Sequence, residues 1–282
     1  MIKSVHLIES GLFKLDGGAM FGVVPQSIWK KMNPPDDNNM CTWALRCLLI
    51  RTENRNILID TGMGDKQDEK FRSHFYPHGD AHLINSIQKE GLKAEDITDV
   101  FLTHLHFDHC GGAVSKDLNG KLIPTFPNAT YWSNQKHWNW ASQPNERERA
   151  SFLKENFIPL VEEGLLKWFD LNGQHPDWPE EIKIQYCNGH TEALMVIDFD
   201  LNGQNLIYPS DLIPSSHHIG MPYIMAYDIR PLETLLEKNQ ILLYALEHDS
   251  VIIFEHDPTQ PFCKIQKTET GRIQISGFDF QL

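Results

Sequence analysis

The sequence predicts an α/β fold in which helices cover β-sheets, within a single domain spanning residues 1–282. A helical pattern at residues 81–91 leads directly into an apolar strand pattern at residues 99–103. Strand patterns return from residue 182, and a clear helix at residues 231–247 is followed by further strands. This alternation is typical of a sheet covered by helices, and a hydrophobic fraction of 41% is ample for a core.

The N-terminal part of the chain is expected to supply strands. Residues 2–15 alternate apolar and polar side chains, which predicts an edge strand. A polar, proline-bearing surface loop follows at residues 33–39. Residues 41–52 and 56–60 then form two further strand candidates around the plausible hairpin turn Glu53-Asn54.

The helix expected at residues 81–91 places Leu83, Ile84 and Ile87 on one face and ends at Gly91. Residues 133–163 are also expected to be largely helical, with breaks at Asn-Pro and Gln-Pro steps, in a region rich in aromatic residues. We interpret this region as a cover that buries its aromatic side chains in the core. A cap over a substrate pocket is the alternative.

The C-terminal part returns to strands at residues 182–187, 194–199 and 205–208, with Asn202-Gly203 as a hairpin turn. Pro231 suits the first turn of the helix at 231–247. Its expected apolar stripe consists of Leu232, Leu235, Leu236, Leu242, Leu243 and Leu246. Closing strands are expected at residues 251–254 and 273–278.

Four potential metal ligands lie within six residues directly after the strand at 99–103. They are His104, His106, Asp108 and His109. Side chains two apart on an extended chain point the same way, so His104 and His106 can bind one cation together. Gly111-Gly112 is expected to let the backbone turn sharply, so that Asp108 and His109 face a second cation.

A single histidine is usually a surface or core residue, and this chain has 14 of them. Four such groups in six residues are harder to explain as packing, because burying them would carry a heavy desolvation cost without a compensating cation. His and carboxylate ligands on a loop favour a two-zinc hydrolytic centre. Mn, Fe or Co could occupy the same ligand atoms.

The pattern His104-x-His106-x-Asp108-His109 resembles the signature of the metallo-β-lactamase superfamily. The resemblance implies an αβ/βα four-layer sandwich, with two mixed β-sheets flanked by helices and the metals at one edge. It also implies three more ligands, each following a strand pattern: His190 in Gly-His-Thr, Asp211 as a carboxylate bridging both metals, and His256.

Other segments extend the resemblance and point to one group within the superfamily. Asp60-Thr61-Gly62 resembles a superfamily motif in which Asp60 would orient a ligand without being one. The glycine-punctuated loop at residues 16–25 and the segment Met225–Asp228 resemble parts of quorum-quenching N-acyl-homoserine lactonases. The loop at 16–25 is either a hairpin with a buried tip or a flap that brings Met20 and Phe21 over a pocket.

The resemblance implies N-acyl-homoserine lactone as the substrate, opened by attack of a metal-bridging hydroxide. Zinc would lower the pKa of water from ~16 to about 7, so no Ser or Cys nucleophile is required. We expect Asp108 or Asp211 to pass a proton to the leaving alkoxide. Phe107, Met20 and Phe21 are the candidate pocket residues for an apolar acyl tail.

The chain also departs from these lactonases. Some of them carry a tyrosine three residues after the bridging aspartate, where this sequence has Pro214. Tyr227 or Tyr223 could take its role of bonding the substrate carbonyl. The departure concerns the substrate and not the metal ligands.

Composition limits the partners and the compartment. A formal charge of −13 argues against a nucleic-acid partner. No apolar run approaches the ~20 residues needed to cross a membrane. Five scattered cysteines without a CxxC pair, and no secretory signal, predict a reduced cytoplasmic protein. The expected partner is a small molecule with an apolar tail, and a homodimer is compatible with the sequence.

Two alternatives compete with the lactonase interpretation. Phe126–Ala129 and Asp211–Ile213 resemble parts of organophosphate triester hydrolases of the same superfamily, which would use much the same centre. A metal-bound redox or binding protein is the second alternative. The flavodiiron branch replaces a ligand histidine and adds a flavodoxin domain, and neither feature is found in this sequence.

Overall fold

The computed structural model describes residues 1–170 and 172–277 and contains two six-stranded sheets and one two-stranded sheet. The chain forms two compact units. Of the described residues, unit 1 comprises Met1–Gly11 and Leu45–Pro179, and unit 2 comprises Leu12–Ala44 and residues 180–277. The single domain expected from the sequence stays a prediction.

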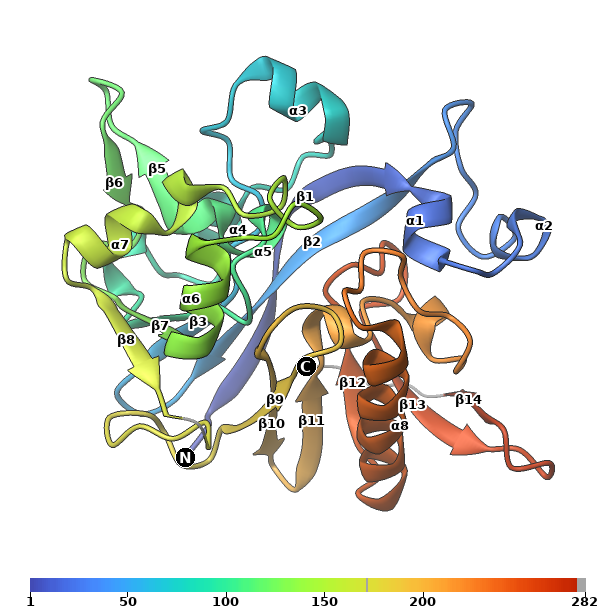
Figure 1. The fold of residues 1–282 in the computed structure, drawn as a ribbon. Helices are drawn as coiled ribbons and strands as arrows, with labels where there is room; N and C mark the ends of the chain where they lie inside the picture. The colour runs from blue at the N-terminus through green and yellow to red at the C-terminus, as the bar shows by residue number, and fades with distance from the viewer. Residues whose placement is uncertain (171, 278–282) are drawn as a thin grey trace. The chain divides into compact units, whose positions relative to one another are not determined.

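The first six-stranded sheet is mixed and has the order β1-β2-β3-β4-β7-β8 (Figure 1). Its strands are β1 (Ser4–Asp16), β2 (Met40–Arg51), β3 (Asn56–Ile59), β4 (Asp99–Phe101), β7 (Thr130–Asn134) and β8 (Leu166–Phe169). β2 and β3 are antiparallel, whereas β3, β4, β7 and β8 pair in parallel. β1 is the edge strand that its alternating sequence predicts.

The second six-stranded sheet is also mixed and has the order β14-β13-β12-β11-β10-β9. Its strands are β9 (Lys183–Cys187), β10 (Leu194–Leu201), β11 (Gln204–Tyr208), β12 (Val251–Ile253), β13 (Phe262–Lys267) and β14 (Ile273–Ser276). Only β11 and β12 pair in parallel, through the crossover that contains the longest helix. The turn Asn202-Gly203 has positive φ at both residues, as a two-residue hairpin of this type requires.

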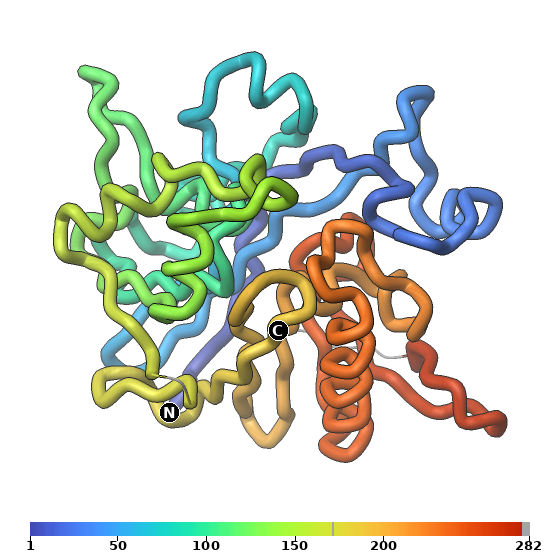
Figure 2. The backbone as a smooth tube through the Cα atoms, viewed as in Figure 1, coloured from blue at the N-terminus to red at the C-terminus, as the bar shows by residue number. Residues whose placement is uncertain are grey.

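A separate hairpin pairs β5 (Val114–Lys116) with β6 (Leu122–Pro124). In the backbone trace it forms a green arm that projects from unit 1 (Figure 2). The α-helices are α1 (Gly17–Phe21), α2 (Gln26–Trp29), α3 (Glu69–Phe75), α4 (Leu83–Lys89), α5 (Phe107–Cys110), α6 (Gln135–Ser142), α7 (Ile158–Glu162) and α8 (Pro231–Glu247). Within the described residues, none of these helices is both long and apolar enough to span a bilayer.

Each unit has its own hydrophobic core. In unit 1, buried residues of the sheet such as Leu58 and Val100 pack with Ile87 of α4 and Leu160 of α7. In unit 2, the sheet packs with Ile241, Leu242 and Ala245 of α8, and Ile207 and Ile252 belong to the same cluster. The prediction of two mixed sheets with covering helices is therefore confirmed.

The expected apolar stripe of α8 is wrong in part. Leu242 is fully buried, but Leu232, Leu236 and Leu243 are exposed. The buried face contains instead Thr234, Glu237, Lys238, Ile241 and Ala245. Burial of Lys238 is compensated because its Nζ donates to the carbonyl oxygens of Gly220 (2.8 Å) and Tyr223 (2.9 Å). The leucine positions alone could not show that hydrogen bonds would offset the cost of burying a polar residue on this face.

The expectation for residues 133–163 is also wrong in part. Helices occupy only 135–142 and 158–162, with a short 3₁₀ turn at 154–156. Residues 130–134 form a parallel strand of the sheet, where Tyr131 and Trp132 are buried. The glycine-punctuated segment at 16–25 contains the short helix α1 rather than a simple loop. Phe278, the end of the expected last strand, lies outside the described residues.

The corrected packing of α8 makes a stability prediction. Replacing Leu242 with Ala should lower the free energy of unfolding by about 2–5 kcal/mol, because a fully buried leucine leaves a cavity. Replacing Leu236, which is 66% exposed, with Ala should change it by less than about 0.5 kcal/mol. Urea unfolding followed by circular dichroism measures both. Equal losses would show that both leucines are packed alike.

Candidate metal centre

In unit 1, His104 and His106 lie just after the short strand β4. The chain stays extended at His106, which caps the N-terminus of α5. Nε2 of His104 and Nδ1 of His106 are 3.1 Å apart, so the two rings converge through one nitrogen each. Both side chains are buried. The same-side placement expected from their spacing is therefore present.

Asp108 and His109 follow on the first turn of α5. Oδ2 of Asp108 lies 3.9 Å from Nε2 of His109, and both residues are buried. The opposite ring nitrogen of His109, Nδ1, lies 3.2 Å from Oδ2 of Asp60. Asp60 thus contacts a ligand candidate from behind, as expected from its sequence motif.

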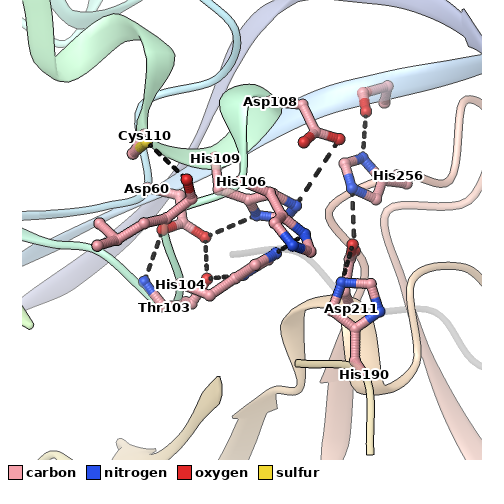
Figure 3. A network of polar contacts seen from close by, with 12 residues as sticks. Asp60, Thr103, His104, His106, Asp108, His109, Cys110, His190, Asp211 and His256 are labelled. Carbon is pink, nitrogen blue, oxygen red and sulfur yellow. Dashed lines mark hydrogen bonds and ion pairs between the residues drawn. The ribbon is translucent and has the colours of Figure 1, made fainter. Parts of the chain in front are cut away.

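Asp60 also fixes the start of the ligand loop (Figure 3). Its Oδ1 accepts a hydrogen bond from the backbone N–H of Thr103 (2.8 Å), and its Oδ2 accepts one from the Thr103 hydroxyl (2.6 Å). The Thr103 hydroxyl in turn lies 3.1 Å from Nδ1 of His104. One buried carboxylate therefore orients His109 directly and His104 through Thr103.

The glycine pair after the motif has a different role from the one expected. Gly111 has helical φ of −60°, so it makes no turn that requires glycine. A Cβ on Gly111 would lie 2.0 Å from the carbonyl oxygen of Met63, and one on Gly112 would lie 2.2 Å from that of Thr61. The glycines are needed because the backbone of the loop packs directly against residues 61–63.

In unit 2, Asp211 has a histidine at each carboxylate oxygen (Figure 3). Oδ2 lies 3.2 Å from Nε2 of His190, and Oδ1 lies 3.0 Å from Nε2 of His256. All three side chains are buried. This is the arrangement that a carboxylate shared by two cations, each with its own imidazole ligand, would require.

The second ring nitrogens in unit 2 also have partners. Nδ1 of His190 lies 2.8 Å from Oδ1 of the buried Asp228, and Nδ1 of His256 lies 2.8 Å from the carbonyl oxygen of Ala44. A partner at Nδ1 keeps the lone pair on Nε2, which then faces Asp211. The segment Met225–Asp228 stood out in the sequence, but the role of Asp228 as the partner of His190 did not.

The donor chemistry fits metal ions. In unit 1, the ligand atoms of His104 and His106 lie within 4.8 Å of each other, as do those of Asp108 and His109. In unit 2, the same holds for His190 and Asp211, and all of these side chains are buried. Buried carboxylates and imidazoles that converge in this way are costly unless a cation compensates them. Nitrogen and oxygen donors suit Zn²⁺, and also Mn²⁺, Fe²⁺ or Co²⁺.

The predicted pocket residues lie in different surroundings. Phe107, on α5, packs against Phe71 and Phe75 of α3 with ring centroids 5.2 and 4.4 Å away. Met20 and Phe21 are buried, and Phe21 stacks on Trp29 and His218. Sequence reasoning missed Phe71 and Phe75, whose i, i+4 spacing on one helix was the available signal.

Two further site predictions stay untested. Tyr227 is 38% exposed in unit 2 and directly precedes Asp228, the partner of His190. Tyr223 packs edge-on against Phe21, with ring centroids 6.4 Å apart. The roles of Tyr227 and of Met20 and Phe21 in substrate binding therefore stay predictions.

Comparison with known proteins agrees with this geometry. A model of the metallo-beta-lactamase superfamily matches residues 46–115, which include the ligand loop. The structure of a probable metal-dependent hydrolase from Staphylococcus aureus aligns over 98% of both chains, with a TM-score of 0.85 and 28% identity. This chain has the metallo-β-lactamase fold, and its residues 46–115 are similar to that superfamily.

Named relatives within the superfamily are more distant. The N-acyl homoserine lactonase AttM of Rhizobium radiobacter is 23% identical over 185 residues, which cover 64% of this chain and 65% of the relative. The match thus spans just under two thirds of that protein. An N-acyl homoserine lactonase of Bacillus cereus is 26% identical over 67% of each chain. The dizinc quorum-quenching lactonase AidC shares the fold, with a TM-score of 0.79 and 22% identity over 100% of this chain and 98% of its own.

The contact between His190 and Asp228 generates a prediction. Replacing Asp228 with Ala should weaken zinc binding about 10- to 100-fold, because His190 loses the partner that orients its ring. Chelator competition measures the affinity. Glu247→Ala, which removes an exposed carboxylate of the same unit, is the control and should bind zinc normally. Unchanged affinity in Asp228→Ala would show that the contact does not position His190.

Proposed function

We propose that this chain is a metal-dependent hydrolase that opens the lactone ring of N-acyl-homoserine lactones. The observation that carries the hydrolytic part is Asp211, with His190 and His256 at its two oxygens. The lactone part is supported by the curated relatives AttM and the Bacillus cereus enzyme, both N-acyl homoserine lactonases.

Seven residues would hold two metal ions, with Zn²⁺ as the first choice. They are His104, His106, Asp108, His109, His190, Asp211 and His256. Bound zinc supplies a water molecule of lowered pKa and a Lewis acid for the substrate carbonyl. AidC, which is described as a dizinc enzyme, supports this choice of metal.

The chain's own groups would orient the ligands and move the proton. Asp60, Thr103 and Asp228 hold the rings of three ligand histidines in place, so little reorganisation is needed during turnover. A carboxylate oxygen of Asp108 or Asp211 would carry the proton to the leaving alkoxide. Both carboxylates are buried, which keeps bulk water away from the transfer.

The apolar acyl tail would lie against Phe107 and its neighbours. Phe71 and Phe75 on α3 are partly exposed, so this aromatic cluster offers apolar surface beside the ligand loop. Tyr227, whose side chain is also partly exposed, would bond the substrate carbonyl in place of the tyrosine that Pro214 replaces. Met20 and Phe21 are buried in unit 2 and stay candidates for the pocket through the resemblance alone.

Phosphotriester hydrolysis remains the second candidate because it needs the same metal chemistry. In the segment Phe126–Ala129, which resembles triester hydrolases, Phe126 and Ala129 belong to the unit 1 core, whereas residues 127 and 128 are exposed. Phe126 is fully buried and its N–H donates to the Tyr131 hydroxyl (3.0 Å). That part of the resemblance therefore concerns packing, and we rank lactone opening first.

The first test compares both reactions in metal-quantified protein. We expect a long-chain N-acyl-homoserine lactone to be opened faster than paraoxon is hydrolysed, with two metal ions per chain. A fully metallated protein without lactonase activity would contradict the substrate assignment. A higher rate with paraoxon would favour the triester alternative.

The variant His106→Ala tests the metal centre itself. It should bind less metal and lose at least about 100-fold in hydrolysis with the fold intact, because His104 loses its partner nitrogen at 3.1 Å. Exposed His74→Ala on α3 is the matched control and should keep both properties. Full activity of His106→Ala at normal metal content would remove His106 from the centre.

A further inference from the structure

A buried carboxylate of unit 1, Glu148, lies behind the ligand candidate His106. The glutamate is 3% exposed and His106 is 7% exposed. Oε1 of Glu148 lies 3.7 Å from Nε2 of His106, whereas Nδ1 is the nitrogen that faces His104. The pair therefore interacts electrostatically, at a distance beyond that of a direct hydrogen bond.

The position of this carboxylate is fixed by its own partners. Oε2 accepts hydrogen bonds from Nε1 of Trp140 (2.7 Å) and from Nδ2 of Asn145 (2.6 Å). Oδ1 of Asn145 accepts the backbone N–H of Glu148 (3.1 Å), which ties the glutamate to the loop after α6. These two side-chain donors use Oε2, and it is Oε1 that lies 3.7 Å from Nε2 of His106.

His106 differs from the other ligand histidines in the nitrogen that it offers. In His104, His109, His190 and His256, Nδ1 meets a partner from the fold: Thr103, Asp60, Asp228 and the Ala44 carbonyl, respectively. In His106, Nδ1 instead faces Nε2 of His104, and Nε2 faces Glu148. A negative charge at Nε2 favours the tautomer with its proton there and its lone pair on Nδ1.

The same region of unit 1 holds the rest of the loop. Nε2 of His137 accepts a hydrogen bond from the backbone N–H of Leu105 (2.8 Å). The carbonyl oxygen of Ser151 accepts one from the backbone N–H of Phe107 (2.9 Å). The ring of Phe152 packs on His106, with centroids 4.7 Å apart. The backbone on both sides of His106 is thus hydrogen-bonded and its ring is packed against Phe152, which helps to keep the ring beside Glu148.

We propose that Glu148 is a positioning residue that makes Nδ1 of His106 the metal-binding nitrogen. This proposal rests on the proposed metal-dependent function. It assigns a role to the aromatic-rich region after β7, which the sequence suggested only as a cover or a cap. Glu148 does not touch the reacting atoms and acts through His106.

Glu148→Gln tests the charge at nearly constant shape. The amide presents N–H donors to Nε2, which favours the opposite tautomer. With Co²⁺ alone as the probe, we expect binding about 10- to 100-fold weaker and an altered visible spectrum. Glu146→Gln is the matched control, because Glu146 lies two residues away with a side chain that is 83% exposed. It should bind Co²⁺ like the wild type.

Glu148→Asp keeps the negative charge. Its loss of Co²⁺ affinity should therefore be less than about a quarter of the loss in Glu148→Gln. Equal losses in both variants, or wild-type binding in Glu148→Gln, would overturn the proposal. If Glu148→Gln does not fold, the ¹⁵N shifts of His106 in zinc-loaded wild-type protein decide. Zinc on Nδ1 with a proton on Nε2 is expected, and zinc on Nε2 overturns it.

These readouts do not depend on turnover. Absence of lactone hydrolysis would contradict the proposed function and leave the role of Glu148 standing. Normal hydrolysis with unchanged metal binding in Glu148→Gln would remove Glu148 and leave the proposed function intact.

Discussion

The orientation of buried imidazole rings by partners on their second nitrogen is the constraint on which the site depends. A ligand histidine with a free choice of tautomer offers its lone pair on either nitrogen and loses metal affinity accordingly. Asp60, Thr103, Asp228 and the Ala44 carbonyl remove that choice for four rings. Most of these partners lie far from their histidine in sequence, so the fold itself sets the ligand geometry.

The need for close backbone packing explains features near the ligand loop that first suggest flexibility. Gly111 and Gly112 have no side chain because residues 61–63 fill the space where a Cβ would lie. Thr61 also bonds the carbonyl oxygen of His109 through both its N–H (2.7 Å) and its hydroxyl (2.9 Å). The short strand β3 and the ligand loop therefore form one rigid piece, which suits a site that must hold its ligands before a metal arrives.

Local sequence patterns predicted the elements whose burial follows a simple period. The bounds of α8 and of the strands β9–β11 were predicted closely because Pro231 and Asn202-Gly203 mark their ends. The strand at 130–134 was missed because a parallel strand is defined by its neighbours β4 and β8, which lie distant in sequence. The predicted apolar stripe of α8 was wrong in part for a related reason. Three carbonyl oxygens of a separate loop accept hydrogen bonds from Lys238, so the buried face of α8 can contain a lysine.

The sequence by itself predicted the ligand motif and the metallo-β-lactamase fold, because metal coordination demands particular side chains at short spacings that rarely arise by chance. The resemblance that this motif carries implied the three later ligands, which stay predictions. Only the tertiary structure decided what stands behind each ring. Glu148 and Asp228 lie 42 and 38 residues from the histidines they face, and no local pattern links them. Charge and hydrogen bonding act through space, so their partners become visible only when the chain has folded.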